Sequence, residues 1–219
     1  MGIVILVATI FVKGWNKSSS DTVLISNQDT SSPLPLSSAP FEELGGMSQD
    51  KSLTLIVKNY PNKDVCDDGG YICIKNNEIW IKNNNTGNEN LLVKSGDISE
   101  YPFANSDNFP FSSIYNLKSP IFSLDNNKVY FMSSAWTTSD AIFSVDISTG
   151  KLKLISDGNS LEVVRIGSDK GNLKVLKHKY YNPPDYGSYD HYYVITDSGK
   201  EIKDLGGISH INGEEIIDK

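Results

Sequence analysis

Residues 141–155 read AIFSVDISTGKLKLI, the clearest indication of the fold class in the sequence. A strand with alternating apolar residues is followed by a Ser-Thr-Gly turn and a second strand of the same kind. Alternation with a period of two predicts strands with one buried face. The turn glycine, Gly150, allows the positive φ that a tight hairpin requires. The stretch therefore predicts a β-hairpin.

The same pattern recurs at residues 78–92 and, more loosely, at residues 191–205. A further strand–turn–strand unit precedes each copy, at residues 44–57, 119–132 and 163–176. Two successive hairpins make a four-stranded meander, and a single sheet of this kind cannot cover both of its faces. The repeats therefore predict an all-β fold, a β-propeller-like array of four-stranded antiparallel blades.

The second repeat resembles the blade of TolB-type (WD40-like) β-propellers. The resemblance is carried by residues 119–125, 128–131, 142–146 and 149–150. The other repeats match in their hairpins only, and Leu124-Asp125-Asn126-Asn127 stands where the family usually has a Pro-Asp-Gly turn. The resemblance extends over about residues 41–217. It implies a propeller and, for many members, an extracytoplasmic binding role, and it carries over no catalytic residue.

Three blades and two strands of a partial fourth are recognisable, whereas a closed propeller needs at least about four blades. The partial fourth blade is indicated by residues 205–209, which echo residues 44–48, and by a predicted turn before residues 215–217. Two interpretations stay open. Residues 3–12 and 22–26 supply the missing strands, or the chain is a fragment of, or partner for, a larger ring.

The amino-terminal residues 3–12 read IVILVATIFV, a run that is long enough for a signal-peptide core but short for a membrane span. We therefore expect residues 1–15 to be a hydrophobic signal or anchor-like segment. Residues 16–40 are rich in Ser and Pro and predict a linker, which leaves residues 41–219 as the propeller-like domain. This layout predicts an extracytoplasmic protein, periplasmic or at the cell surface, tethered to the membrane through residues 3–12. The alternative is that the run is a buried strand.

The net charge indicates which partners to exclude, and the cysteines relate to the redox state of the compartment. A formal charge of −7 repels phosphate backbones, so we expect no nucleic-acid partner. Cys66 and Cys73 flank an Asp-Asp-Gly-Gly turn and predict a disulfide if the compartment is oxidising; the alternative is a pair of free thiols.

Motifs of known chemistry are missing from the sequence: it has no Gly-x-Ser-x-Gly elbow, no P-loop and no dinucleotide-binding glycine fingerprint. We therefore expect no catalytic residue and no cofactor. His178 and His191 are interpreted as ordinary strand or surface histidines, and the acidic stretch Asp64–Asp68 as a hairpin loop without the spacing of an EF-hand. We accordingly expect no metal site.

Two segments expected to be long loops, residues 100–115 and 180–193, combine aromatic residues with proline. Aromatic rings at loop tips provide rigid contact surfaces for partners, although such rings also pack on their own blade. The binding residues predicted from these segments are Tyr181, Tyr186, Tyr189, Phe109 and Phe111.

The leading functional hypothesis is a non-catalytic extracytoplasmic binding module of the cell envelope that recognises a protein or peptide. The alternatives are a polysaccharide lyase or hydrolase built on a propeller, and a structural or vestigial domain. The sequence does not indicate an oligomeric state.

Overall fold

The computed structural model describes most of the compact unit Ser37–Lys219. The described ranges are 39–66, 73–102, 112–181, 187–211 and 214–217. The amino-terminal segment expected at residues 1–15, and nearly all of the linker expected at residues 16–40, lie outside them. None of the described residues belongs to a helix that is both long and apolar enough to cross a membrane.

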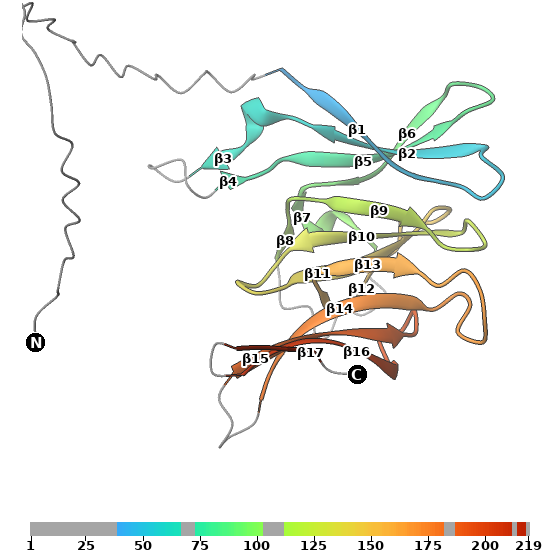
Figure 1. Ribbon diagram of the computed structural model, residues 1–219. Helices are drawn as coiled ribbons and strands as arrows, with labels where there is room; N and C mark the ends of the chain where they lie inside the picture. Colours follow the sequence, from blue (N-terminus) through green and yellow to red (C-terminus); the bar gives the residue numbers. More distant parts are fainter. Residues whose placement is uncertain (1–38, 67–72, 103–111, 182–186, 212–213, 218–219) are drawn as a thin grey trace, which may run out of the picture. The chain divides into compact units, whose positions relative to one another are not determined.

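Three larger antiparallel sheets form the described part of the chain (Figure 1). The first has the order β1 (Phe41–Met47), β2 (Leu53–Asn59), β5 (Asn77–Asn83) and β6 (Glu89–Lys94). The second has the order β12 (Leu152–Gly158), β11 (Asp140–Asp146), β10 (Lys128–Ser134) and β9 (Lys118–Phe122). The third has the order β13 (Ser160–Val163), β14 (Leu173–Tyr180), β15 (Gly187–Ile195), β16 (Glu201–Ile211) and β17 (Glu214–Ile217).

Short elements occupy the connections. They are the strands β3 (Val65–Cys66), β4 (Cys73–Ile74), β7 (Gly96–Asp97) and β8 (Ser113–Ile114), and the 3₁₀ turns η1 (Pro61–Lys63) and η2 (Ile98–Glu100).

The hairpins predicted from the repeats are confirmed. Each one forms an antiparallel pair: β1–β2, β5–β6, β9–β10, β11–β12, β13–β14 and β15–β16. The turn glycines Gly87, Gly150 and Gly199 adopt φ values of 75°, 68° and 86°, as tight hairpin turns require. The all-β fold with three successive blades is therefore confirmed.

The residues expected to begin a fourth blade instead belong to the third sheet. Residues 205–211 continue β16, and β17 pairs with the end of β16 as a fifth strand. The reason is the length of β15: its first residues pair with the last residues of β16, from Gly187 opposite Ile211 onward. The far half of β16 thus finds its partner within the third sheet.

The second sheet is buried on both of its faces. Val129 and Phe131 on β10 join a core with the first sheet, whereas Tyr130 and Met132 join a core with the third sheet. This explains why β10 is apolar at consecutive positions, since alternate residues face different neighbours. Sheets stacked face to face through two cores are the arrangement of successive propeller blades.

The connections from one sheet to the next leave and enter at the same end of the three sheets, where β6 and β12 end and β9 and β13 begin. Lys75 at the β4–β5 connection contacts Asn116 before β9, and Asn159 Nδ2 after β12 donates to the carbonyl of Thr138 between β10 and β11 at 2.8 Å. The opposite end holds the turns of the predicted hairpins, and there Lys128 pairs with Asp197. We call the first end the connection end.

Candidate functional site

The predicted binding residues fall into two groups. Tyr181 and Tyr189 lie among the described residues, and their ring centroids are 4.9 Å apart. Tyr186, Phe109 and Phe111 lie outside the described residues. The sequence therefore identified a pair of aromatic side chains that the fold brings into contact.

The expectation of a long loop at residues 180–193 is wrong. The strand β14 extends to Tyr180 and β15 begins at Gly187, with Tyr180 opposite Ser188 and Lys179 opposite Tyr189. Tyr189 is therefore a strand residue and does not lie at a loop tip. Aromatic and β-branched residues favour strands, and alternation continues through this stretch.

An aromatic row runs along one face of the third sheet. It consists of Tyr181, Tyr189, His191 and Tyr193, with successive centroid distances of 4.9, 4.7 and 6.3 Å. The last three alternate along β15 and so share one face. Tyr193 is buried, whereas Tyr181 and Tyr189 are only half-buried at the connection end. The row thus leads from the core to the surface.

The inner end of the row is anchored by packing and charge. Tyr193 belongs to the core between the second and third sheets, and Lys179 Nζ lies 4.1 Å from the centroid of its ring. Burial raises the pKa of Tyr193, and the negative charge of Asp204 raises it further. The phenol is therefore neutral at physiological pH and serves as an anchor rather than a base.

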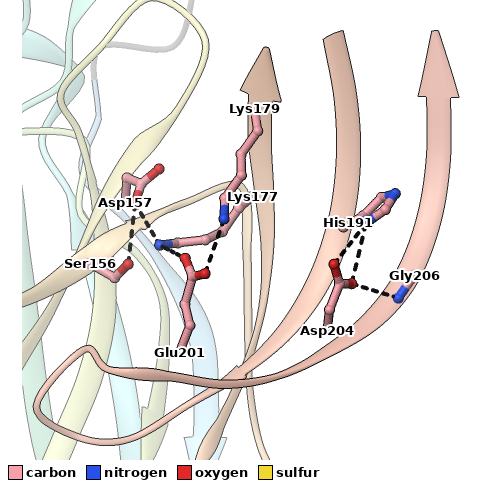
Figure 2. A network of polar contacts seen from close by, with 8 residues as sticks. All are labelled: Ser156, Asp157, Lys177, Lys179, His191, Glu201, Asp204 and Gly206. Carbon is pink, nitrogen blue, oxygen red and sulfur yellow. Dashed lines mark hydrogen bonds and ion pairs between the residues drawn. The ribbon is translucent and has the colours of Figure 1, made fainter. Parts of the chain in front are cut away.

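A network of charged side chains lies on the same face (Figure 2). Lys177 Nζ is 3.0 Å from Asp157 and 2.8 Å from Glu201, and Glu201 also accepts from Lys179 at 3.0 Å. The Lys177 residue is only 7 % exposed, so its charge requires these partners. Because Asp157 comes from β12, the network joins the second sheet to the third.

Two carboxylates of this face are held in the ionised state. Burial acts to raise the pKa of Glu201, but hydrogen bonds from Lys177 and Lys179 outweigh it and lower the pKa below the usual 4.5. Burial likewise opposes ionisation of Asp204, and the N–H of Gly206 with His191 nevertheless lowers its pKa. His191 Nδ1 lies 3.2 Å from Asp204, which fixes the imidazole within the row.

We expect Lys177→Met to lower the free energy of unfolding by about 2 kcal/mol, less than the roughly 3–5 kcal/mol for breaking a fully buried pair. The expected loss of stability is smaller than that range because the side chains of Asp157 and Glu201 are 38 % and 36 % exposed to solvent. Urea unfolding would measure it. The matched variant Lys174→Met, which breaks the exposed pair with Glu162, should cost less than about 1 kcal/mol. Equal losses of stability in both variants would show that the buried Lys177 ion pairs stabilise the fold no more than an exposed pair does.

The pH dependence of this effect has a definite sign. Since the pKa of Glu201 is lowered in the folded chain, its stabilisation is present above pH 4.5 and is lost as the pH falls through the lowered pKa. Lys177→Met should therefore lower the free energy of unfolding most near neutral pH, and the difference from the unchanged chain should disappear in acid.

Sequence reasoning missed Lys177, Lys179, Glu201 and Asp204. Their contacts involve four strands, β12, β14, β15 and β16, and composition does not encode how these strands pair and pack. One signal was present: in the alternating series Leu173, Val175, Lys177, a lysine follows two core positions on the same face.

The two histidines considered for metal binding lie on opposite faces of the third sheet. His178 contacts Asp190 at 2.8 Å, whereas the neighbouring position Lys177 is opposite His191. Among the residues that the structure describes, no group of three or more His, Cys, Asp or Glu side chains is placed to hold a metal ion.

The side chains of the predicted disulfide, Cys66 and Cys73, lie outside those that the structure describes. The backbones of Cys66 and Cys73 are directly opposite each other in the β3–β4 pair. Direct partners in an antiparallel pair have Cα separations of about 4.5–5.5 Å, within the range for a disulfide. The bond itself stays a prediction.

Neither a protein-family model nor a curated protein sequence matches the chain. An acylaminoacyl peptidase from Pyrococcus horikoshii matches with a TM-score of 0.46 and 16 % identity, over 78 % of this chain and 26 % of that chain. Dipeptidyl peptidase 4 from Porphyromonas gingivalis matches with a TM-score of 0.49 and 10 % identity, over 77 % and 26 %.

A third solved structure is the β-propeller domain of the trilobed protease from Pyrococcus furiosus, which has an open velcro topology. Its TM-score is 0.37 at 14 % identity, over 80 % of this chain and 62 % of that chain. The chain spans about a quarter of the length of the two peptidases. Its own sheets and their two cores define an all-β, propeller-like protein.

Proposed function

We propose that the chain is a non-catalytic binding module, a TolB-type propeller of the cell envelope that recognises a protein or peptide segment on the aromatic row. The observation that carries the proposal is the contact between Tyr181 and Tyr189, half-buried rings at the open end of a row anchored in the core. Partly exposed tyrosines that are already ordered offer contact area at little entropic cost.

The ion pairs around the aromatic row support a role in keeping its rings in place for a ligand. Lys177, Glu201 and Asp204 each have a described partner, and both carboxylates are stabilised in their charged form. Because these charged side chains are already paired with one another or with neighbours, they hold the aromatic rings in position. A peptide would lay apolar or proline side chains on the rings and place polar groups near the network, the arrangement of a binding hot spot with a polar rim.

The proposal is tested with peptides selected from a random displayed library on the full chain. For the tightest peptide, we expect Tyr181→Ala and Tyr189→Ala each to raise the dissociation constant about tenfold or more, as hot-spot tyrosines do. The control is Tyr192→Ala, on the opposite face beneath Lys174, which should change the constant less than about twofold. Unchanged binding in the Tyr181→Ala/Tyr189→Ala double variant would exclude the row as the site.

A further inference from the structure

A second candidate site lies between the second and third sheets, at the end opposite the connection end. It is a cavity of about 300 Å³, the lower limit of the roughly 300–1,000 Å³ of small-molecule sites. One wall comes from β10 and the turn before it, and the other from the β13–β14 connection and the β15–β16 turn. The lining includes Leu124, Asp125, Lys128, Tyr130, Asn172 and Asp197.

Tyr130 brings a hydroxyl without a hydrogen-bond partner to this cavity. The residue is 3 % exposed, and it belongs to the core between the second and third sheets. Among the residues that the structure describes, none donates to its hydroxyl or accepts from it. In the same part of the chain, Asn59 Nδ2 is the one fully enclosed side-chain polar atom that lacks a partner, so the Tyr130 hydroxyl is open to the cavity that it lines. Because a buried tyrosine usually finds a partner for its O–H, the cavity is where a ligand would supply one.

Three charged groups lie near this hydroxyl. Burial raises the pKa of the Tyr130 phenol, and the positive charge of Lys128 opposes this effect. The carboxylates of Asp197 and Asp125 raise the same pKa further, so the hydroxyl lies within electrostatic reach of all three groups. The phenol is therefore protonated at physiological pH and can both donate and accept a hydrogen bond.

The charged groups of the lining are already paired or hydrogen-bonded. Lys128 Nζ lies 2.8 Å from Asp197 Oδ2, a contact that joins the second sheet to the third. Asp125 accepts from Ser123 Oγ at 2.6 Å and from Asn127 Nδ2 at 2.9 Å. An added cation would compete with Lys128 for Asp197, and an added anion would meet two carboxylates. The lining therefore disfavours a ligand that carries a net charge.

Hydrogen-bonding capacity nevertheless remains around the cavity. An ammonium has three N–H donors and a carboxylate has about four acceptor positions, so the printed contacts of Lys128 and Asp197 do not use all of them. The side-chain amide of Asn172 has no hydrogen-bond partner among the described residues. Donors and acceptors side by side suit a ligand whose own groups both donate and accept, as alcohol hydroxyls do. Leu124 adds an apolar surface for the C–H groups of such a ligand.

The lining is held in place by contacts of the chain itself. Ser123 Oγ accepts from the N–H of Lys128 at 3.0 Å, and Lys153 Nζ donates to the carbonyl of Asp197 at 2.9 Å. Gly171 has a φ of 93°, and a Cβ added there would lie 3.9 Å from Leu124 Cδ1, so the β13–β14 connection lies against the β9–β10 turn. Groups that are already ordered lose less entropy when a ligand binds.

We propose that this cavity binds an uncharged, hydroxyl-rich molecule of the size of one sugar ring. One ligand hydroxyl pairs with the Tyr130 hydroxyl. Further hydroxyls donate to the carboxylates and accept from Lys128 and Asn172. The site goes beyond the proposed function, because it lies at the opposite end of the sheets and shares no residue with the aromatic row.

The test is an NMR titration of the full chain, with isotope-labelled tyrosine, against D-glucose, D-galactose, D-mannose and N-acetyl-D-glucosamine. The amino and 6-phosphate derivatives of the tightest sugar supply a positive and a negative charge on the same ring. Tyr130→Phe removes one oxygen from a buried ring and keeps its packing, and its spectrum assigns the Tyr130 signal. Asp197→Asn keeps an acceptor for Lys128, and Tyr192→Phe on the opposite face of the third sheet is the matched control. Saturation transfer to the sugar compares the affinities of the variants.

The expected result is a saturable shift of the Tyr130 ring signal with at least one neutral sugar, whose charged derivatives bind about tenfold more weakly or worse. Tyr130→Phe and Asp197→Asn should weaken binding of that sugar about tenfold or more, with Tyr192→Phe and Tyr189→Ala unchanged. Without sugar, Tyr130→Phe should leave the midpoint of urea unfolding unchanged or raised, because the lost hydroxyl has no partner in the described chain.

Four outcomes would overturn the proposal. The first two are a Tyr130 signal that responds to no neutral sugar, and a charged derivative that binds as tightly as its parent. The third is unchanged binding in Tyr130→Phe. The fourth is a lower urea midpoint for sugar-free Tyr130→Phe, since the hydroxyl would then serve the fold rather than a ligand.

Discussion

Phe143→Ala should lower the free energy of unfolding by about 3–5 kcal/mol, the range for removing a fully buried aromatic side chain. Phe143 is 0 % exposed and its ring is stacked on Phe131, with a centroid distance of 5.4 Å. Both rings belong to the core that joins the first and second sheets. Alanine would leave a cavity where the two sheets meet, and the stacked contact would be lost.

Urea unfolding followed by far-ultraviolet circular dichroism measures this effect. The control is Phe41→Ala on the edge strand β1, where the side chain is 48 % exposed, with an expected loss below about 1 kcal/mol. Similar losses for the two variants would show that the first and second sheets do not share the core described here.

Gly199→Ala is expected to destabilise the chain by about 2–5 kcal/mol, combining a left-handed alanine with overpacking. Gly199 has a φ of 86°, and an added Cβ would lie 2.0 Å from the carbonyl oxygen of Ile155. Ile155 is on β12, so the turn between β15 and β16 presses against the backbone of the preceding sheet. Backbone cannot yield as a flexible side chain would, and the two sheets must separate.

Gly87→Ala separates the two contributions. Gly87 occupies the equivalent turn of the first sheet with a φ of 75°, but its added Cβ would meet nothing within 4 Å. We expect Gly87→Ala to lower the free energy of unfolding by only about 1–2 kcal/mol, because only the left-handed backbone conformation is unfavourable for alanine there. Equal thermal-unfolding midpoints for the two variants would contradict the contact between the second and third sheets.

The sequence predicted the hairpins because local rules govern them. Alternation and a turn glycine specify a strand pair within about fifteen residues, as in residues 141–155. The number of strands in a sheet is a different matter, since it depends on how far a long strand continues to pair. Residues 205–211 resemble the start of a blade, yet they remain in β16 because β15 is long enough to pair with them.

The candidate site was only partly predictable for the same reason. Tyr181 and Tyr189 were predicted as aromatic binding residues, but the contact between their rings depends on the register that places Lys179 opposite Tyr189. The network around Lys177 draws one partner from β12 and another from β16, so no local pattern encodes it.

Intermolecular nuclear Overhauser effects would detect a peptide that is bound on the aromatic row. The full chain would carry isotope-labelled tyrosine, and a selected peptide would be bound at saturation. We predict contacts from the peptide to the ring protons of Tyr181 and Tyr189, which lie together on one face. Contacts confined to Tyr192, on the opposite face of the third sheet, or to no tyrosine of this sheet, would contradict peptide binding on the row.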